Sequence, residues 1–193
     1  QGSYWYHPHY HPAVNTQMYG GLSGFMQVGD PLAKIPGLEN TPRNLAVLKT
    51  MDVGVNDQTG DLELAAIDTV NIQARPVNRM TLFTVNGEFK PSESINSGWQ
   101  SLTLTNQDNN YYFNIKLVQV DQDGARSDMP LFIYGEDGHQ YPQIRRAKKT
   151  VLGYDQPNDT NPVPPFGLTS NQPARGFAKA DDLISLSSGK RMD

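Results

Sequence analysis

The sequence predicts an all-β fold, and three observations support that class. Apolar and polar residues alternate over short stretches, most clearly at Leu102 and Leu104 and at Phe113, Ile115 and Leu117, which is the two-residue period of a half-buried strand. Residues that form turns, mainly Asn, Asp, Gly and Pro, separate these stretches. No window shows a sustained helical period bounded by caps, although residues 60–67 could form a short helix. Many short strands joined by turns favour an antiparallel β-sandwich.

Strand patterns recur along the whole chain. We expect strands at residues 3–7, 25–28, 45–51, 80–85, 100–105, 111–120, 131–134 and 183–186. Residues 31–42 hold three prolines with small or polar residues between them, which is the composition of a connector between domains. We assign no role to the divergent stretch 52–77. The Pro- and Asn-rich stretch 155–180 has no apolar period, and we interpret it as a surface insertion.

The composition limits the classes of partner. The 193 residues carry a formal net charge of −4 and a mean hydropathy of −0.57, as expected of a soluble globular chain. No apolar run approaches the ~20 residues that a membrane span needs, so we expect no transmembrane segment. Nucleic-acid binding requires clustered Lys and Arg. We interpret the basic run at residues 145–149 as a solvated turn or edge and not as a phosphate site, and we expect no nucleic-acid partner.

Three of the four histidines lie within the first dozen residues. The motif W-Y-H-P-H-Y-H spans residues 5–11 and holds His7, His9 and His11 at alternating positions. In an extended strand every second side chain points to the same face, so the three imidazoles can converge there. Neutral imidazole is a common ligand of copper and zinc. The pattern predicts a metal site, and the competing interpretation is a solvated chain end that binds metal only opportunistically.

The residues after the histidines favour the metal site. Residues 17–28 read Q-M-Y-G-G-L-S-G-F-M-Q-V and are followed by Asp30 and Pro31. The order from residue 3 onward is a strand, a polar turn, a bend marked by glycines and a second apolar strand that ends in a turn. This order predicts a hairpin-like unit and not a disordered tag.

The same residues resemble a known family. The run G-S-Y-W-Y-H-P-H-Y-H at residues 2–11, followed by Q-M-Y-G-G-L-S-G-F-M-Q-V-G-D-P at residues 17–31, resembles the end of the first cupredoxin domain of the multicopper oxidases. That group contains laccases, bilirubin oxidases and cuprous oxidases. In the family an H-x-H pair lies just before a G-L-x-G strand, and both histidines bind the type 3 coppers of a trinuclear cluster. The resemblance implies that His7 and His9 are type 3 copper ligands, while His11 lies beyond the pair and ranks below them.

The resemblance extends over most of the chain. F-T-V-N-G at residues 83–87 and L-I-S-L-S-S-G-K-R-M-D at residues 183–193 match the middle domain of the family, the latter its L-x-L-x-x-G-x-R-x-D strand and turn. The implied fold is a cupredoxin-like Greek-key β-sandwich, with one partial domain plus one nearly complete domain. Residues 1–35 would be the C-terminal part of the first cupredoxin domain, 36–44 a linker, and 45–193 a second cupredoxin-like domain that lacks its last strand or strands and carries the insertion at about 155–180. Because the chain starts at Gln1 without a targeting segment, we expect a fragment.

The resemblance also implies a function for the parent protein. Multicopper oxidases oxidise reducing substrates by single electrons at a type 1 copper and reduce O2 to water at the trinuclear copper cluster. The implied partners are O2, a small reducing substrate and the remaining domains of the parent chain, and the implied location is periplasmic or secreted. The alternative is a non-catalytic cupredoxin-like copper-binding or structural module.

The residues present limit what the chain can do alone. It has no Cys and four His, whereas a type 1 copper site needs a Cys thiolate and the family's cluster uses eight histidines. We therefore expect this fragment alone to be inactive, and whether the parent is an enzyme stays open.

Other residues that could carry chemistry have plainer interpretations. His139 follows an Asp-Gly turn with no second His nearby in the sequence, and we interpret it as an exposed histidine. The N-terminal aromatic residues are more simply packing at a domain interface than a redox relay; this set is Tyr4, Trp5, Tyr6, Tyr10 and Tyr19.

Overall fold

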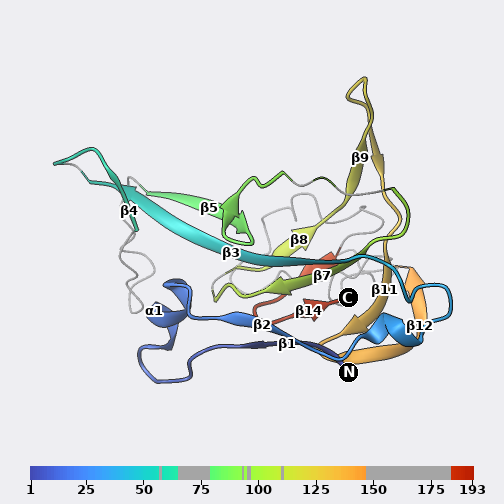
Figure 1. Cartoon of the computed structure of the whole chain (residues 1–193). Coiled ribbons are helices and arrows are strands. Elements are labelled where there is room, and N and C mark those ends of the chain that lie inside the picture. The colour runs from blue at the N-terminus through green and yellow to red at the C-terminus, as the bar shows by residue number, and fades with distance from the viewer. Residues whose placement is uncertain (57, 65–78, 93, 95–96, 110, 147–183) are drawn as a thin grey trace, which may run out of the picture.

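The computed structural model describes residues 1–56, 58–64, 79–92, 94, 97–109, 111–146 and 184–193 (Figure 1). Over these residues the chain is mostly β-strand, and helical structure is confined to α1 (Val14–Tyr19) and the 3-10 helix η1 (Pro31–Lys34). The all-β class is therefore confirmed. Neither of these helices has the length and apolar character needed to cross a membrane.

One large sheet forms the centre of the fold. Its strands are β3 (Arg43–Val55), β4 (Leu62–Leu64), β5 (Arg79–Val85), β6 (Glu88–Phe89), β7 (Ser101–Asn106), β11 (Phe132–Glu136), β12 (His139–Arg146) and β14 (Arg191–Met192). They are arranged in the order β12-β11-β14-β7-β3-β5-β6, with β4 also paired to β3. β3 pairs antiparallel with β5 but parallel with β7. The predicted antiparallel pattern is wrong for the β3–β7 pair, because β6 already runs in the direction of β3 and β7 follows it in that same direction instead of returning as a hairpin.

The remaining strands form three pairs. They are β1 (Gly2–Tyr6) with β2 (Gly24–Val28), β8 (Phe113–Ile115) with β13 (Ile184–Leu186), and β9 (Val118–Val120) with β10 (Arg126–Asp128). The strand predicted at residues 111–120 is interrupted, because β8 pairs with β13 whereas β9 pairs with β10. The β9–β10 pair projects from the body of the molecule at the top of Figure 1.

The hydrophobic core joins the large sheet to the β8–β13 pair. Its buried members are Ala46, Leu48, Leu104, Ile133, Ile184, Leu186 and Met192. Leu186 on β13 is fully buried, and Phe113 and Ile115 on β8 pack against the same cluster. Leu102 and Leu104 of β7, which the alternation singled out, pack in this core together with Ala46 and Leu48 of β3, as a period of two requires.

The predicted short helix at residues 60–67 is wrong. Leu62 to Leu64 form β4, in which Leu62 lies opposite Val55 and Leu64 opposite Val53; residues 65–67 lie outside the described residues. Leu62 and Leu64 are two apart, and a strand can pair with the long β3 whereas an isolated helix of this length is marginal. The predicted insertion at about 155–180 also lies outside the described residues.

The connector after β2 is packed and not free. Asp30 caps η1 by accepting a hydrogen bond from the Leu32 amide at 3.0 Å, and its carboxylate pairs with Arg43 at 3.0 Å. Leu32 is buried, and the Gln140 side chain donates to the Pro31 carbonyl at 3.0 Å. β3 begins at Arg43, so the last two residues of the predicted linker belong to β3.

Candidate metal site

The histidines lie in the connection between β1 and β2. These strands pair antiparallel from Gly2 opposite Val28 to Tyr6 opposite Gly24, so the predicted hairpin-like unit is confirmed, with α1 inserted in its connection. β1 ends at Tyr6, and the expectation that His7, His9 and His11 stand on one face of a strand is wrong. The reason is that the ladder stops at Gly24, which leaves the following residues without a partner strand.

The rings at alternate positions are nevertheless neighbours. Trp5 stacks on His7 with ring centroids 4.4 Å apart and planes 23° apart. The centroids of His7 and His9 are 6.0 Å apart, and those of His9 and His11 are 4.9 Å apart in an edge-to-face arrangement. His7 is half-buried whereas His9 and His11 are exposed. His7 is therefore the histidine that the fold holds most firmly.

One ring nitrogen of His7 has a fixed partner. Its Nδ1 lies 2.7 Å from the carbonyl oxygen of Pro8. Because a carbonyl can only accept, Nδ1 carries the proton and donates it, and Nε2 keeps its lone pair. A hydrogen bond from one imidazole nitrogen to a backbone carbonyl is the usual support for a metal bound at the other. In the neutral imidazole this contact leaves Nε2 as the nitrogen that can ligate a metal.

The ring spacings fit imidazoles that share more than one ion. With metal–nitrogen bonds of about 2.0–2.1 Å, two imidazoles on one tetrahedral ion have centroids about 5 Å apart. The His7–His9 spacing of 6.0 Å exceeds this value and suits ligands of neighbouring ions, while the His9–His11 spacing of 4.9 Å matches it. Among the described residues no three His, Cys, Asp or Glu side chains are grouped to hold a metal ion. Ions bound by these imidazoles would therefore take their further ligands from water or from residues outside this group.

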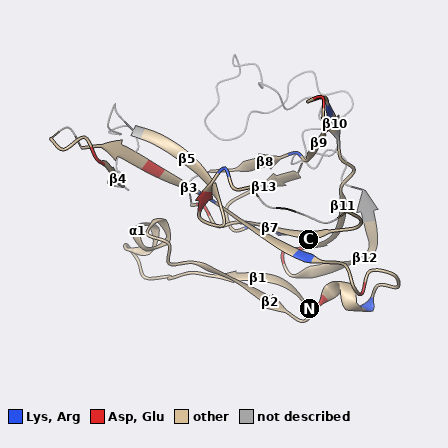
Figure 2. Cartoon of the chain, turned by 45° about the horizontal axis from the view of Figure 1, so that its top comes forward, with Lys and Arg blue, Asp and Glu red and all other residues tan. Residues whose placement is uncertain are grey.

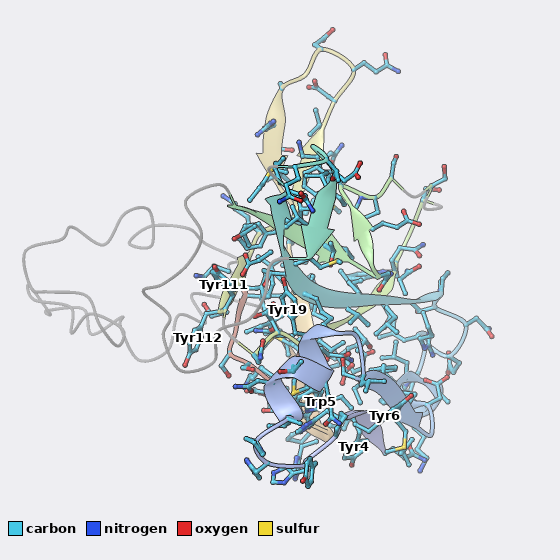
Figure 3. All side chains as sticks on the ribbon, turned by 90° about the vertical axis from the view of Figure 1, so that its left-hand side faces the viewer. Tyr4, Trp5, Tyr6, Tyr19, Tyr111 and Tyr112 are labelled. Carbon is cyan, nitrogen blue, oxygen red and sulfur yellow. The ribbon has the colours of Figure 1, made fainter. Side chains whose placement is uncertain are left out.

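The aromatic residues predicted at a domain interface divide into two kinds (Figure 3). Tyr4 donates from its hydroxyl to the Gly138 carbonyl at 3.3 Å, and the Tyr19 hydroxyl bonds both main-chain groups of Asp52 at 2.7 and 2.8 Å. These contacts, with those of Trp5, join the N-terminal segment to the large sheet. Tyr6 and Tyr10 are exposed instead, by 62% and 70%.

β1 is anchored at Ser3, a residue that the sequence reasoning missed. Ser3 is fully buried, and its hydroxyl bonds the Asp193 carboxylate, which also accepts from Thr103 Oγ1 at 2.7 Å. Arg191 Nε donates to the Ser3 carbonyl at 3.3 Å. The closing R-x-D motif is the signal that could have indicated this role, because it places Arg191 on β14 and Asp193 directly after that strand.

Charge near this anchor comes from β14 and the β11–β12 turn. Asp137 lies 3.3 Å from Arg191 and 3.4 Å from Lys190 and accepts from the Arg191 amide at 3.0 Å. β1 and β2 carry no charged residue of their own (Figure 2). The contact at Ser3 therefore joins an uncharged hairpin to a charged region in which Asp137 is already paired with Lys190 and Arg191.

Lys49, a half-buried cation on β3, holds α1 in place. Lys49 Nζ donates to the Met18 carbonyl at 2.6 Å, at the C-terminal end of the helix, where a cation is favourable. Burial lowers the pKa of Lys49, and the Asp108 carboxylate opposes that shift. This lysine supports the connection that carries the histidines and is not part of the histidine group.

The remaining candidates lie apart from the histidine segment in the chain. His139 is exposed, as predicted, with Nδ1 3.2 Å from the Asp137 carbonyl, and it starts β12. The first two residues of the basic run at 145–149 are the last two of β12, and residues 147–149 lie outside the described residues.

Comparison with known proteins adds no assignment. No protein-family model matches the chain, and no curated protein matches it.

Proposed function

We propose that this chain is part of a copper oxidase of the multicopper oxidase type, in which His7 and His9 ligate neighbouring copper ions. The observation that carries the proposal is the His7 imidazole, whose Nδ1 is held by the Pro8 carbonyl at 2.7 Å so that Nε2 is free to ligate. The His7 and His9 rings lie 6.0 Å apart, near enough for the two imidazoles to ligate neighbouring ions. The H-x-H and G-L-x-G motifs at their family spacing support the same assignment.

The residues have separate tasks in this proposal. A trinuclear copper cluster, when bound, would pass the electrons taken from the reducing substrate to O2, which is reduced to water. His7 and His9 offer neutral imidazole nitrogens, Pro8 holds the His7 proton at Nδ1, and Trp5 covers one face of the His7 ring. The β1–β2 hairpin holds these residues against β14, and the large sheet with the β8–β13 pair would be a cupredoxin-like Greek-key domain.

The proposal includes the partners that the resemblance implies. They are O2, a small reducing substrate and further domains of a parent chain, at a periplasmic or secreted location. The parent's own sequence distinguishes the oxidase from a non-catalytic copper-binding or structural module. An upstream H-x-H-G and a downstream H-C-H followed by Met establish the oxidase, whereas a parent sequence without them leaves the binding module.

Copper titration of the 193-residue chain tests the ligand assignment. We expect His7→Ala combined with His9→Ala to weaken Cu(II) binding in calorimetry by at least about tenfold, or about 1.4 kcal/mol. His11→Ala should have a smaller effect, and the exposed His139→Ala is the matched control. The electron paramagnetic resonance spectrum of the bound Cu(II) should show imidazole nitrogen couplings that the double variant loses. Unchanged affinity and couplings in the double variant would contradict the assignment.

The copper-loaded chain also has an expected absorption spectrum. Because it contains no Cys, it should show no blue thiolate-to-copper band and no laccase-type turnover. Either signal from the pure chain would show that the proposal misplaces the electron-entry site.

A further inference from the structure

The indole of Trp5 lies between the histidine segment and β14. One neighbour is the His7 ring, stacked at 4.4 Å. The other is Gly189, where a Cβ would lie only 3.1 Å from Cζ2 of the indole. A methyl group at position 189 would require the indole to shift by a few tenths of an ångström, so glycine at this position permits the fit of Trp5.

Gly189 is itself held firmly. Its φ of +76° is a conformation that side chains disfavour. Its amide donates to the Asn106 carbonyl at 2.9 Å, and its carbonyl accepts from Arg191 Nη1 at 2.6 Å. Asn106 is fully buried on β7. The indole therefore meets a turn that is hydrogen-bonded to the core sheet.

The other end of β1 is fixed by the same segment. Arg191 Nε donates to the Ser3 carbonyl, and the Asp193 carboxylate accepts from the Ser3 hydroxyl. The segment Gly189–Asp193, which we name the β14 clamp, thus contacts β1 both at Ser3 and at Trp5. Trp5 is two residues before His7, so a shift of the clamp reaches the imidazole through one stacked ring.

We propose that the β14 clamp positions the His7 imidazole through Trp5, and so sets the copper affinity of the histidine segment from the neighbouring part of the fold. This proposal rests on the proposed function for its copper readout. The Pro8 carbonyl fixes which nitrogen of His7 carries the proton, and the indole fixes the plane of the ring. Together they define the direction of Nε2. Trp5 is a positioning residue, since it supports a ligand that it does not replace.

Gly189→Ala tests the clamp, with Gly60→Ala as its matched control. Gly60 has nearly the same φ, +77°, but open space where a Cβ would point, so both variants share the backbone strain and only Gly189→Ala displaces the indole. We expect Gly189→Ala to weaken Cu(II) binding about 10-fold to 100-fold, the range for partners that orient a ligand. Gly60→Ala should bind as the unchanged chain does.

A second measurement needs no copper. Long-range proton–nitrogen correlation spectra of the metal-free chain report the ring shifts of His7 and which of its nitrogens carries the proton. Gly189→Ala should move the His7 ring signals and reduce the Nδ1-protonated form, and Gly60→Ala should not. Circular dichroism confirms that each variant is folded. If Gly189→Ala is unfolded, Trp5→Leu and Trp5→Phe replace it, and Phe should restore part of the copper affinity that Leu loses.

The two proposals fail in different ways. Unchanged His7 signals and unchanged copper affinity in folded Gly189→Ala overturn the clamp and leave the copper site standing. Shifted His7 signals in a chain that binds no copper through His7 overturn the copper site and leave the positioning by the clamp standing.

Discussion

Removing the Ser3 hydroxyl should loosen the N-terminal hairpin from the sheet. Ser3 is 0% exposed and its hydroxyl bonds the Asp193 carboxylate. A hydrogen bond to a charged group contributes about 1.5–3 kcal/mol, so we expect Ser3→Ala to lower the free energy of unfolding by that amount. For a chain of this size the loss corresponds to a fall in Tm of about 3–12 °C.

A double-mutant cycle with Thr103 separates this bond from general packing. Thr103 Oγ1 donates to the same Asp193 oxygen at 2.7 Å, so Thr103→Val alone leaves the carboxylate with Ser3. The double variant removes both hydroxyl groups that donate to the Asp193 carboxylate, and Asp193 is only 6% exposed. A buried carboxylate without partners is costly, and we expect the double variant to lose about 0.5–3 kcal/mol more than the sum of the single losses.

Urea unfolding followed by circular dichroism measures these differences. Ser185→Ala is the control, because it removes a serine whose bond to Asn114 lies at the surface, and it should cost less than about 0.5 kcal/mol. The reasoning is refuted if Ser3→Ala costs no more than this control, or if the Ser3 and Thr103 losses simply add.

Three further perturbations test other parts of the fold. Leu186→Ala empties a fully buried position and should cost about 2–5 kcal/mol in urea unfolding; a loss below 1 kcal/mol would contradict its place in the core. Burial raises the pKa of Tyr134 above its ordinary value of 10.0, although its bond to a serine hydroxyl opposes the shift. The folded chain therefore keeps the phenol protonated where the unfolded chain ionises, so stability should fall as pH rises above 10.0, and the difference between Tyr134→Phe and the unchanged chain should narrow there. An unchanged difference between pH 7 and 11 would show that the phenol ionises equally in both states. Gly138→Ala places a Cβ 2.6 Å from the Tyr4 ring, whereas Gly124→Ala, at nearly the same φ, meets open space; Gly138→Ala should be the less stable by about 1–3 kcal/mol in thermal unfolding, and equal Tm values would exclude the contact.

Local patterns in the sequence were sufficient for much of the sheet. The alternation at Leu102 and Leu104 predicted β7, and the apolar run from residue 80 predicted β5. The order of strand, turn, glycine bend and strand predicted the β1–β2 pair. These predictions succeed because a strand with one buried face must repeat every two residues, wherever its partner lies.

Helix and strand were confused where local signals were weak. α1 has no side-chain cap and buries only Met18. Its sequence therefore shows no row of apolar residues at helical spacing. It forms where Lys49 and Tyr19 tie it to β3. β4 was taken for a possible helix because a three-residue strand becomes evident only beside its partner.

At the candidate site, the residues that could ligate a metal are evident from local chemistry, whereas the contacts that hold them arise only when the chain folds. His7, His9 and His11 follow from side-chain chemistry and spacing alone. The contacts that support them do not, because Ser3 and Asp193 lie 190 residues apart in the chain. They meet only when β14 takes its place in the large sheet and the β1–β2 pair packs against it. A contact over that distance leaves no periodic trace in the chain, since each partner obeys only its own strand. The ladder's end at Tyr6 and the fit of Trp5 against Gly189 are likewise properties of packing, which only the folded chain defines.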